Sequence, residues 1–173
     1  MIYLIGPRAC GKTSLAAALG ATCGYAWYDL DALFCQKQGC TIDTFVKNHG
    51  WPRFREQEHQ LLAWLSDHYA QESRMVIATG GGIVLDSRNR SLLAKGTVLY
   101  LFVPIEELAR RLAKDPVESQ RPSLTGKDIV SEVAQVVGER DPLYRQCADF
   151  VLDGTLPSEK LIAALLACVS GQV

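Results

Sequence analysis

Short apolar segments alternate along the chain with longer segments in which apolar residues recur at helical spacing. This pattern predicts strands at residues 3–5, 25–29, 75–78, 97–103 and 150–152, and helices at 13–19, 51–69, 86–94, 104–114, 129–144 and 157–169. The strand at 97–103 is continuously apolar, which is typical of burial on both faces of a sheet. Strands separated by helices predict βαβ units, and therefore an α/β fold with a parallel sheet covered on both faces. The polar segment at 115–127 predicts a loop.

Composition and charge exclude several classes of protein. A chain of 173 residues has room for one domain with one core. Its net charge of −1 is unlike the basic balance of a nucleic-acid-binding protein. The longest apolar runs, at 98–103 and 161–169, are shorter than the roughly 18 residues of a membrane-spanning helix. The chain start lacks the basic segment of a signal peptide, and the six cysteines form no C-x-x-C pair. We therefore expect a cytoplasmic monomer with free thiols and with neither nucleic-acid nor membrane partners.

The strongest motif is G-P-R-A-C-G-K-T at residues 6–13, which matches the phosphate-loop pattern G-x-x-x-x-G-K-[ST] in full. It follows a predicted strand and opens a predicted helix. Its glycines let successive N–H groups face a phosphate, and the helix start adds partial positive charge. Lys12 supplies a cation for the β- and γ-phosphates, and the Thr13 hydroxyl can bind Mg²⁺. The motif therefore predicts a site for a nucleotide and Mg²⁺, without identifying the acceptor of a phosphoryl group.

Two aspartates lie at the end of the second predicted strand. Asp29 and Asp31 are two residues apart, so on an extended chain their side chains face the same way. Ligands of open α/β sheets bind beyond the carboxyl ends of the strands, so this pair could serve both a metal and an acceptor. An equal alternative is that Asp31 is the N-cap of a helix that begins at Ala32.

Glycines and arginines supply further candidates for an acceptor site. Gly80–Gly82 follows the third predicted strand and would let the backbone approach a bound molecule closely, although a flexible turn is an equal alternative. Arg55, Arg121 and Arg140 lie near the ends of predicted elements. A guanidinium group binds two oxygens of a carboxylate or phosphate at once. Composition alone does not select these three arginines from the others in the chain.

Taken together, the motifs resemble those of the shikimate kinase family. The matching segments are G-P-R-A-C-G-K-T at 6–13, D-L-D at 29–31, W-P-R-F-R-E-Q-E at 51–58, G-G-G at 80–82, R-P-S-L-T-G at 121–126 and R-D-P-L-Y at 140–144. They follow the family's order and spacing, and the resemblance extends from residue 1 to about residue 153. The phosphate loop is common to many nucleotide enzymes, whereas the combination of the other segments is specific.

The resemblance implies a fold, a reaction and a cofactor. The fold is the three-layer α/β fold of nucleoside monophosphate kinases, with a five-stranded parallel sheet, a lid at about 114–126 and a substrate-binding helical segment at about 31–60. The reaction is transfer of the γ-phosphoryl group of ATP to the 3-hydroxyl of shikimate, which gives shikimate 3-phosphate and ADP in aromatic amino acid biosynthesis. The implied cofactor is Mg²⁺.

The resemblance also implies a role for each motif. It assigns ATP binding to Gly6, Ala9, Cys10, Gly11, Lys12, Thr13, Ser14 and Arg121, and Mg²⁺ binding to Thr13 and Asp29. It assigns shikimate binding to Asp31, Arg55, Gly80, Gly81, Gly82 and Arg140. The implied catalytic residues are Lys12, Asp31 and Arg121, and Lys114 and Pro157 are candidates to flank the adenine.

Two departures from the family and two competing functions complete the prediction. Gln146 stands where family members often carry Glu, and the segment at 115–120 is poor in cations. A gluconate or nucleoside monophosphate kinase would keep the phosphate loop, but would not explain the D-x-D, G-G-G and R-x-P-x-Y segments together. A regulatory nucleotide-binding protein without catalysis is the alternative from another class, and the retained Lys12, Thr13 and aspartates argue against it.

Overall fold

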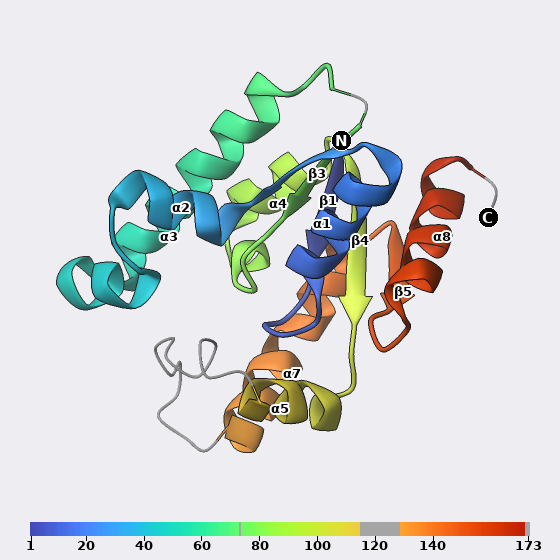
Figure 1. Cartoon of the computed structure of the whole chain (residues 1–173). Helices are drawn as coiled ribbons and strands as arrows, with labels where there is room; N and C mark the ends of the chain where they lie inside the picture. Colours follow the sequence, from blue (N-terminus) through green and yellow to red (C-terminus); the bar gives the residue numbers. More distant parts are fainter. Residues whose placement is uncertain (73, 115–128, 172–173) are drawn as a thin grey trace.

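The computed structural model of the protein describes residues 1–72, 74–114 and 129–171 (Figure 1). Within these ranges five strands form one parallel sheet in the order β2-β3-β1-β4-β5. The strands are β1 (Ile2–Ile5), β2 (Ala26–Asp29), β3 (Met75–Ala78), β4 (Thr97–Phe102) and β5 (Phe150–Asp153). The predicted parallel α/β sheet is therefore confirmed, and β3 has the predicted bounds.

Helices cover both faces of the sheet, as Figure 1 shows. They are α1 (Lys12–Cys23), α2 (Leu30–Gln38), α3 (Ile42–His68), α4 (Ser87–Leu93), α5 (Ile105–Lys114), α7 (Ile129–Cys147) and α8 (Ser158–Val169), with a short 3-10 helix η1 (Ile83–Leu85). Alternate residues of β1 enter the two layers: Ile2 and Leu4 pack in the core under α1 and α8, whereas Tyr3 and Ile5 pack in the core under α3 and α4. In the part of the chain that the structure describes, no helix combines the length and apolar composition needed to cross a bilayer.

Residues 30–38 and 42–49 are helical, although the apolar pattern predicts no helix there. Their helices are defined by capping residues rather than by an apolar period. Thr41 caps the start of α3, and Gly39 ends α2 with a φ of 66°. Gly50, with φ 78° and ψ 163°, interrupts α3, and Pro52 lies in the first turn after this break. The predicted helix at 51–69 corresponds to the part of α3 after Gly50.

The strand order brings three loops together at one edge of the sheet. β3 pairs with both β1 and β2, so the segments that follow these three strands are neighbours. They are the phosphate loop after β1, Asp29 at the end of β2, and Gly80–Gly82 after β3. The carboxyl edge of a parallel sheet is where ligands bind in open α/β folds.

Candidate functional site

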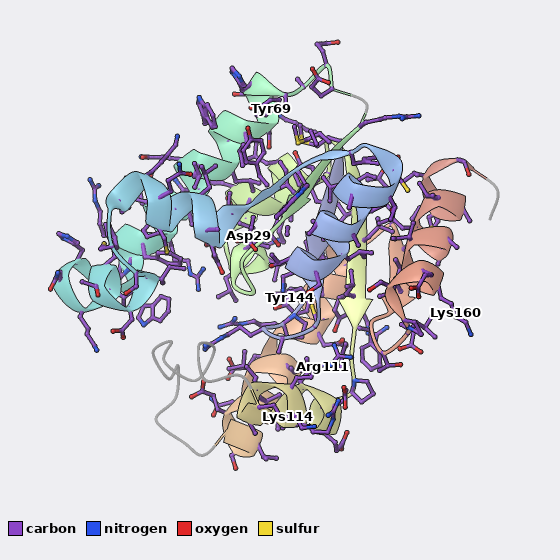
Figure 2. The ribbon with its side chains drawn as sticks, viewed as in Figure 1. Asp29, Tyr69, Arg111, Lys114, Tyr144 and Lys160 are labelled. Atoms are coloured by element: carbon purple, nitrogen blue, oxygen red, sulfur yellow. The ribbon has the colours of Figure 1, made fainter. Side chains whose placement is uncertain are left out.

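A cavity of about 1030 Å³ lies at this edge of the sheet. The phosphate loop lines it on one side, and the end of β2 and the start of α2 line it on another. Figure 2 shows Asp29 at the end of β2, and Arg111 of α5 belongs to the same cavity lining. The lining includes residues predicted for the nucleotide and Mg²⁺ and residues predicted for the acceptor. They are Ala9, Gly11, Lys12, Thr13, Ser14, Asp29, Asp31 and Gly81.

Backbone conformation explains the glycines of the phosphate loop. Gly6 has a φ of 142°, and a Cβ at this position would lie 2.9 Å from the carbonyl oxygen of Leu101. Gly11 has a φ of 102° and precedes α1 without a side chain that caps the helix. The first N–H groups of α1 are therefore directed at the cavity without competition from a capping side chain. Ala9 adopts a φ of 60°, which an L-residue adopts only at a cost.

The Lys12 ammonium is folded back into the phosphate loop. Its side chain is buried, with 8% exposure, and Nζ donates hydrogen bonds to the carbonyl oxygens of Gly6 at 2.9 Å and Pro7 at 2.7 Å. The Sγ of Cys10 lies 3.5 Å from the same nitrogen. The positive charge is thus already located inside the loop that would hold a phosphate.

Thr13 and Asp29, the predicted metal ligands, contact each other directly. The Thr13 hydroxyl donates to Asp29 Oδ2 at 2.5 Å, and Asp29 Oδ1 accepts from the backbone N–H of Ala32 at 2.9 Å. Mg²⁺ prefers oxygen ligands and is commonly held by one or two protein oxygens together with substrate phosphates. A hydroxyl and a carboxylate beside the phosphate loop fit this ion, although the described residues hold no cluster of three or more His, Cys, Asp or Glu side chains. Asp29 is also the N-cap of α2, so the alternative of Asp31 as the cap is wrong.

The acceptor candidates converge on Gly80–Gly82. A Cβ at Gly80 would lie 2.8 Å from Oδ1 of Asp31 and 2.8 Å from Oε1 of Glu58. A Cβ at Gly82 would overlap the Arg55 guanidinium, at 2.2 Å from Nη2. A side chain at Gly80 or Gly82 would therefore collide with these three charged groups, so their close approach to the backbone requires glycine.

Arg140 reaches the same glycines from α7. Its Nη1 donates to the carbonyl oxygen of Gly81 at 3.1 Å, and its side chain is buried with 9% exposure. Neither Arg140 nor Arg55 is among the residues that line the large cavity, although both contact the glycine segment that borders it. A Cβ at Gly81 would lie 3.5 Å from the backbone N of Arg8 and 3.6 Å from the carbonyl oxygen of Gly6. The glycine segment therefore joins the phosphate loop to the two arginines.

Glu58 belongs to this cluster, although the sequence motifs assign it no role of its own. It is 2% exposed, and its Oε2 accepts a hydrogen bond from Nη1 of Arg55 at 2.6 Å. Burial raises the pKa of Glu58, and the negative charge of Asp31 raises it further, while Arg55 and Arg140 oppose the shift. The i,i+3 spacing of Arg55 and Glu58 on α3 is the signal from which their pairing could have been predicted.

Arg111 is a second residue that the sequence does not single out. It lines the cavity, and its guanidinium donates to the carbonyl oxygens of Ala9 at 3.2 Å and Gly154 at 3.0 Å. Its Nε pairs with Glu107 at 2.7 Å. Arg111 thus ties α5 to the phosphate loop.

The remaining predictions lie away from the described site or outside the described residues. Lys114 and Pro157 are exposed, and neither is among the residues that line the described cavity. Arg121 and nearly all of the predicted lid at 114–126 lie outside the described residues.

Comparisons with known proteins agree with the geometry. A family model described as shikimate kinase matches residues 8–170. The chain is 42% identical over 170 residues to shikimate kinase from Nitratidesulfovibrio vulgaris, with 98% of this chain and 95% of that protein covered. The structure of shikimate kinase from Acinetobacter baumannii in complex with shikimate superposes with a TM-score of 0.88 at 29% identity, covering 99% of this chain and 93% of that chain. A gluconokinase from Sinorhizobium meliloti, 16% identical with a TM-score of 0.54 and 99% and 91% coverage, shares the fold alone.

Proposed function

Because the chain belongs to the shikimate kinase family and phosphorylates shikimate, we propose that it transfers the γ-phosphoryl group of ATP to the 3-hydroxyl of shikimate. The products would be shikimate 3-phosphate and ADP, within aromatic amino acid biosynthesis. The observation that supports this reaction best is the position of Gly80–Gly82. This segment has the phosphate loop on one side and the group of Asp31, Arg55 and Arg140 on the other.

The phosphate loop would hold the nucleotide, through the backbone of Gly6, Ala9, Cys10 and Gly11 and through the side chains that follow them. Lys12 exchanges the carbonyl oxygens that it now contacts for oxygens of the β- and γ-phosphates, so its charge needs to move little. Ser14 lines the same part of the cavity. Thr13 and Asp29 would hold Mg²⁺, which when bound neutralises part of the phosphate charge.

The acceptor would be held by groups of opposite charge. Arg55 and Arg140 would bind the carboxylate of shikimate, since each presents guanidinium N–H donors beside the same glycine segment. Asp31 would orient the acceptor hydroxyl in line with the γ-phosphate and accept its proton. The missing side chains at Gly80, Gly81 and Gly82 leave space for a small ring close to the backbone.

Two further segments would complete the site. The helical segment at about 31–60 carries Asp31 and Arg55, and we propose that it forms the substrate-binding region. By resemblance to the family, Arg121 in the segment at about 114–126 would stabilise charge on the transferred phosphoryl group. A cytoplasmic location and a monomeric state remain predictions from the sequence.

Production of ADP from Mg²⁺-ATP tests this function. The purified protein should release ADP rapidly with shikimate, and far more slowly with gluconate, AMP or CMP at equal concentration. Phosphorus–proton coupling in the NMR spectrum of the product should place the phosphate on carbon 3. Faster turnover with another acceptor, or ATP binding with no turnover on any acceptor, would contradict the proposed reaction.

A further inference from the structure

Tyr144 is a buried residue that the proposed mechanism does not use. It lies on α7 with 0% exposure (Figure 2). Its hydroxyl donates a hydrogen bond to the carbonyl oxygen of Gly81. Arg140 donates to the same oxygen from one helical turn earlier. The two donors therefore share one acceptor at the centre of the site.

The position of this carbonyl group affects both halves of the site. On one side, a Cβ at Gly81 would be in van der Waals contact with the backbone of Gly6 and Arg8 in the phosphate loop, so this glycine borders the loop. On the other side, Gly81 is a hydrogen-bond partner of the Arg140 guanidinium, whose Nε is buried with no partner among the described residues. A shift of the Gly81 carbonyl would therefore change the orientation of Arg140.

The ring of Tyr144 is itself held in place. It packs on Tyr100 of β4 with a centroid distance of 5.0 Å, and a Cβ at Gly6 would lie 3.4 Å from the Tyr100 ring. The Tyr100 hydroxyl points elsewhere, since it donates to Oδ1 of Asp141 at 2.8 Å. Burial raises the pKa of the Tyr144 phenol, so the group remains a neutral donor at ordinary pH.

We propose that Tyr144 is a positioning residue whose hydroxyl fixes the Gly81 carbonyl, and thereby orients Arg140 towards the acid group of the acceptor. This inference rests on the proposed role of Arg140 in carboxylate binding. Without the hydroxyl, the Gly81 carbonyl group would lose one of its two hydrogen-bond donors, and the Arg140 guanidinium that contacts it would be less firmly oriented. The affinity for the acceptor would then fall, while the contacts of the nucleotide would be retained.

Tyr144→Phe and Tyr100→Phe form a matched pair, because each removes one hydroxyl from the same buried pair of rings. Tyr144→Phe should raise the KM for shikimate about fivefold, the factor given by the loss of one ordinary hydrogen bond. It should change the KM for ATP less than about twofold on the same scale. Tyr100→Phe should leave both constants near the parent values, with a comparable change in Tm. Equal shikimate KM values in the two variants would overturn the proposal, because the hydroxyl at 144 would then be merely structural.

A double-mutant cycle separates this proposal from the function on which it rests. In an Arg140→Lys background, Tyr144→Phe should no longer change the shikimate KM, since the group that it orients is gone. A persisting effect would overturn the proposed route through Arg140. If Arg140→Lys itself left the shikimate KM unchanged, the carboxylate-binding role would fail instead. If the parent protein did not phosphorylate shikimate, the reaction would fail. Soluble expression and a cooperative thermal transition establish that each variant is folded.

Discussion

Gly82→Ala would displace Arg55 without straining the backbone. Gly82 has a φ of −100°, which alanine adopts readily. The added Cβ would fall 2.2 Å from Nη2 and 2.5 Å from Cζ of Arg55, far inside van der Waals contact. The guanidinium lies at the end of a flexible side chain, so it can move away while the chain still folds. That movement would also disturb its 2.6 Å contact with Glu58.

The magnitude follows from the contacts that Arg55 would lose. A hydrogen bond to a charged group contributes about 1.5–3 kcal/mol, so loss of the proposed contact between Arg55 and the shikimate carboxylate should raise the shikimate KM roughly 10- to 150-fold. The KM for ATP should stay within about twofold, because Arg55 is not among the residues that line the nucleotide side of the cavity. Leaving Glu58 buried without its partner should lower the free energy of unfolding by about 1–3 kcal/mol.

Initial rates at varied shikimate and at varied ATP, together with urea unfolding, would measure these effects. Gly138→Ala is the matched control. A Cβ at Gly138 meets no atom within 4 Å, and the residue lies within α7. This control should keep the parent KM values and gain about 1 kcal/mol of stability from the higher helix propensity of alanine. A parent-like shikimate KM in Gly82→Ala would refute the placement of Arg55 on the acceptor.

Three further substitutions test other parts of the site. Asp31→Asn should lower kcat at least about tenfold in the ADP-release assay if its carboxylate orients or deprotonates the acceptor, and near-normal turnover would remove it from the mechanism. Glu58→Gln tests a pH dependence: burial raises the native pKa of Glu58 above its ordinary value of 4.5, so its stabilising contribution is complete below that value and is lost as pH rises through the native pKa. Urea unfolding from about pH 4 to about pH 8 should therefore show the variant gaining stability relative to the parent, and a difference that does not vary with pH would contradict the burial argument. Ala9→Gly should remove the strain of the left-handed φ of 60°, which costs an L-residue roughly 1–2 kcal/mol. The same change makes the unfolded chain more flexible, which lowers the free energy of unfolding by about 0.4–1 kcal/mol. The free energy of unfolding should therefore rise by about 0 to 1.6 kcal/mol, and a clear loss would show that Ala9 is not strained.

The strands and the phosphate loop could be predicted because their signals are local. The central strands β1, β3 and β4 are buried and continuously apolar, and the loop requires glycine, lysine and threonine at fixed spacing. Helix α2 lacked such a signal, since it is short and its bounds depend on caps at Asp29 and Gly39. Asp29 ends β2, caps α2 and contacts the Thr13 hydroxyl. The residue type alone therefore does not show whether an aspartate caps a helix or binds a ligand.

The arginines of the site show where sequence reasoning ends. Arg110 and Arg111 are adjacent, and both pair with Glu107. Arg111 alone of the two donates to the phosphate-loop carbonyl groups among the described contacts, because the packing of α5 directs neighbouring residues to different sides. Only the resemblance to a family singles out Arg55 and Arg140, since neither differs in its local sequence from a surface arginine. In the fold, Arg55 lies against Gly82 and Arg140 donates to the Gly81 carbonyl group, and this shared location is the physical reason to assign both arginines to one site.

The carboxylate of Asp29 serves two elements at once, and this complicates the interpretation of variants there. One oxygen holds the first turn of α2, the helix that carries Asp31, while the other faces Thr13. An alanine at 29 would therefore loosen the acceptor side together with the nucleotide side, and weaker dependence on Mg²⁺ could not be separated from a frayed helix. Asparagine keeps an oxygen for the cap while removing the charge, so comparison of the two replacements would distinguish electrostatic from mechanical communication between the ligands.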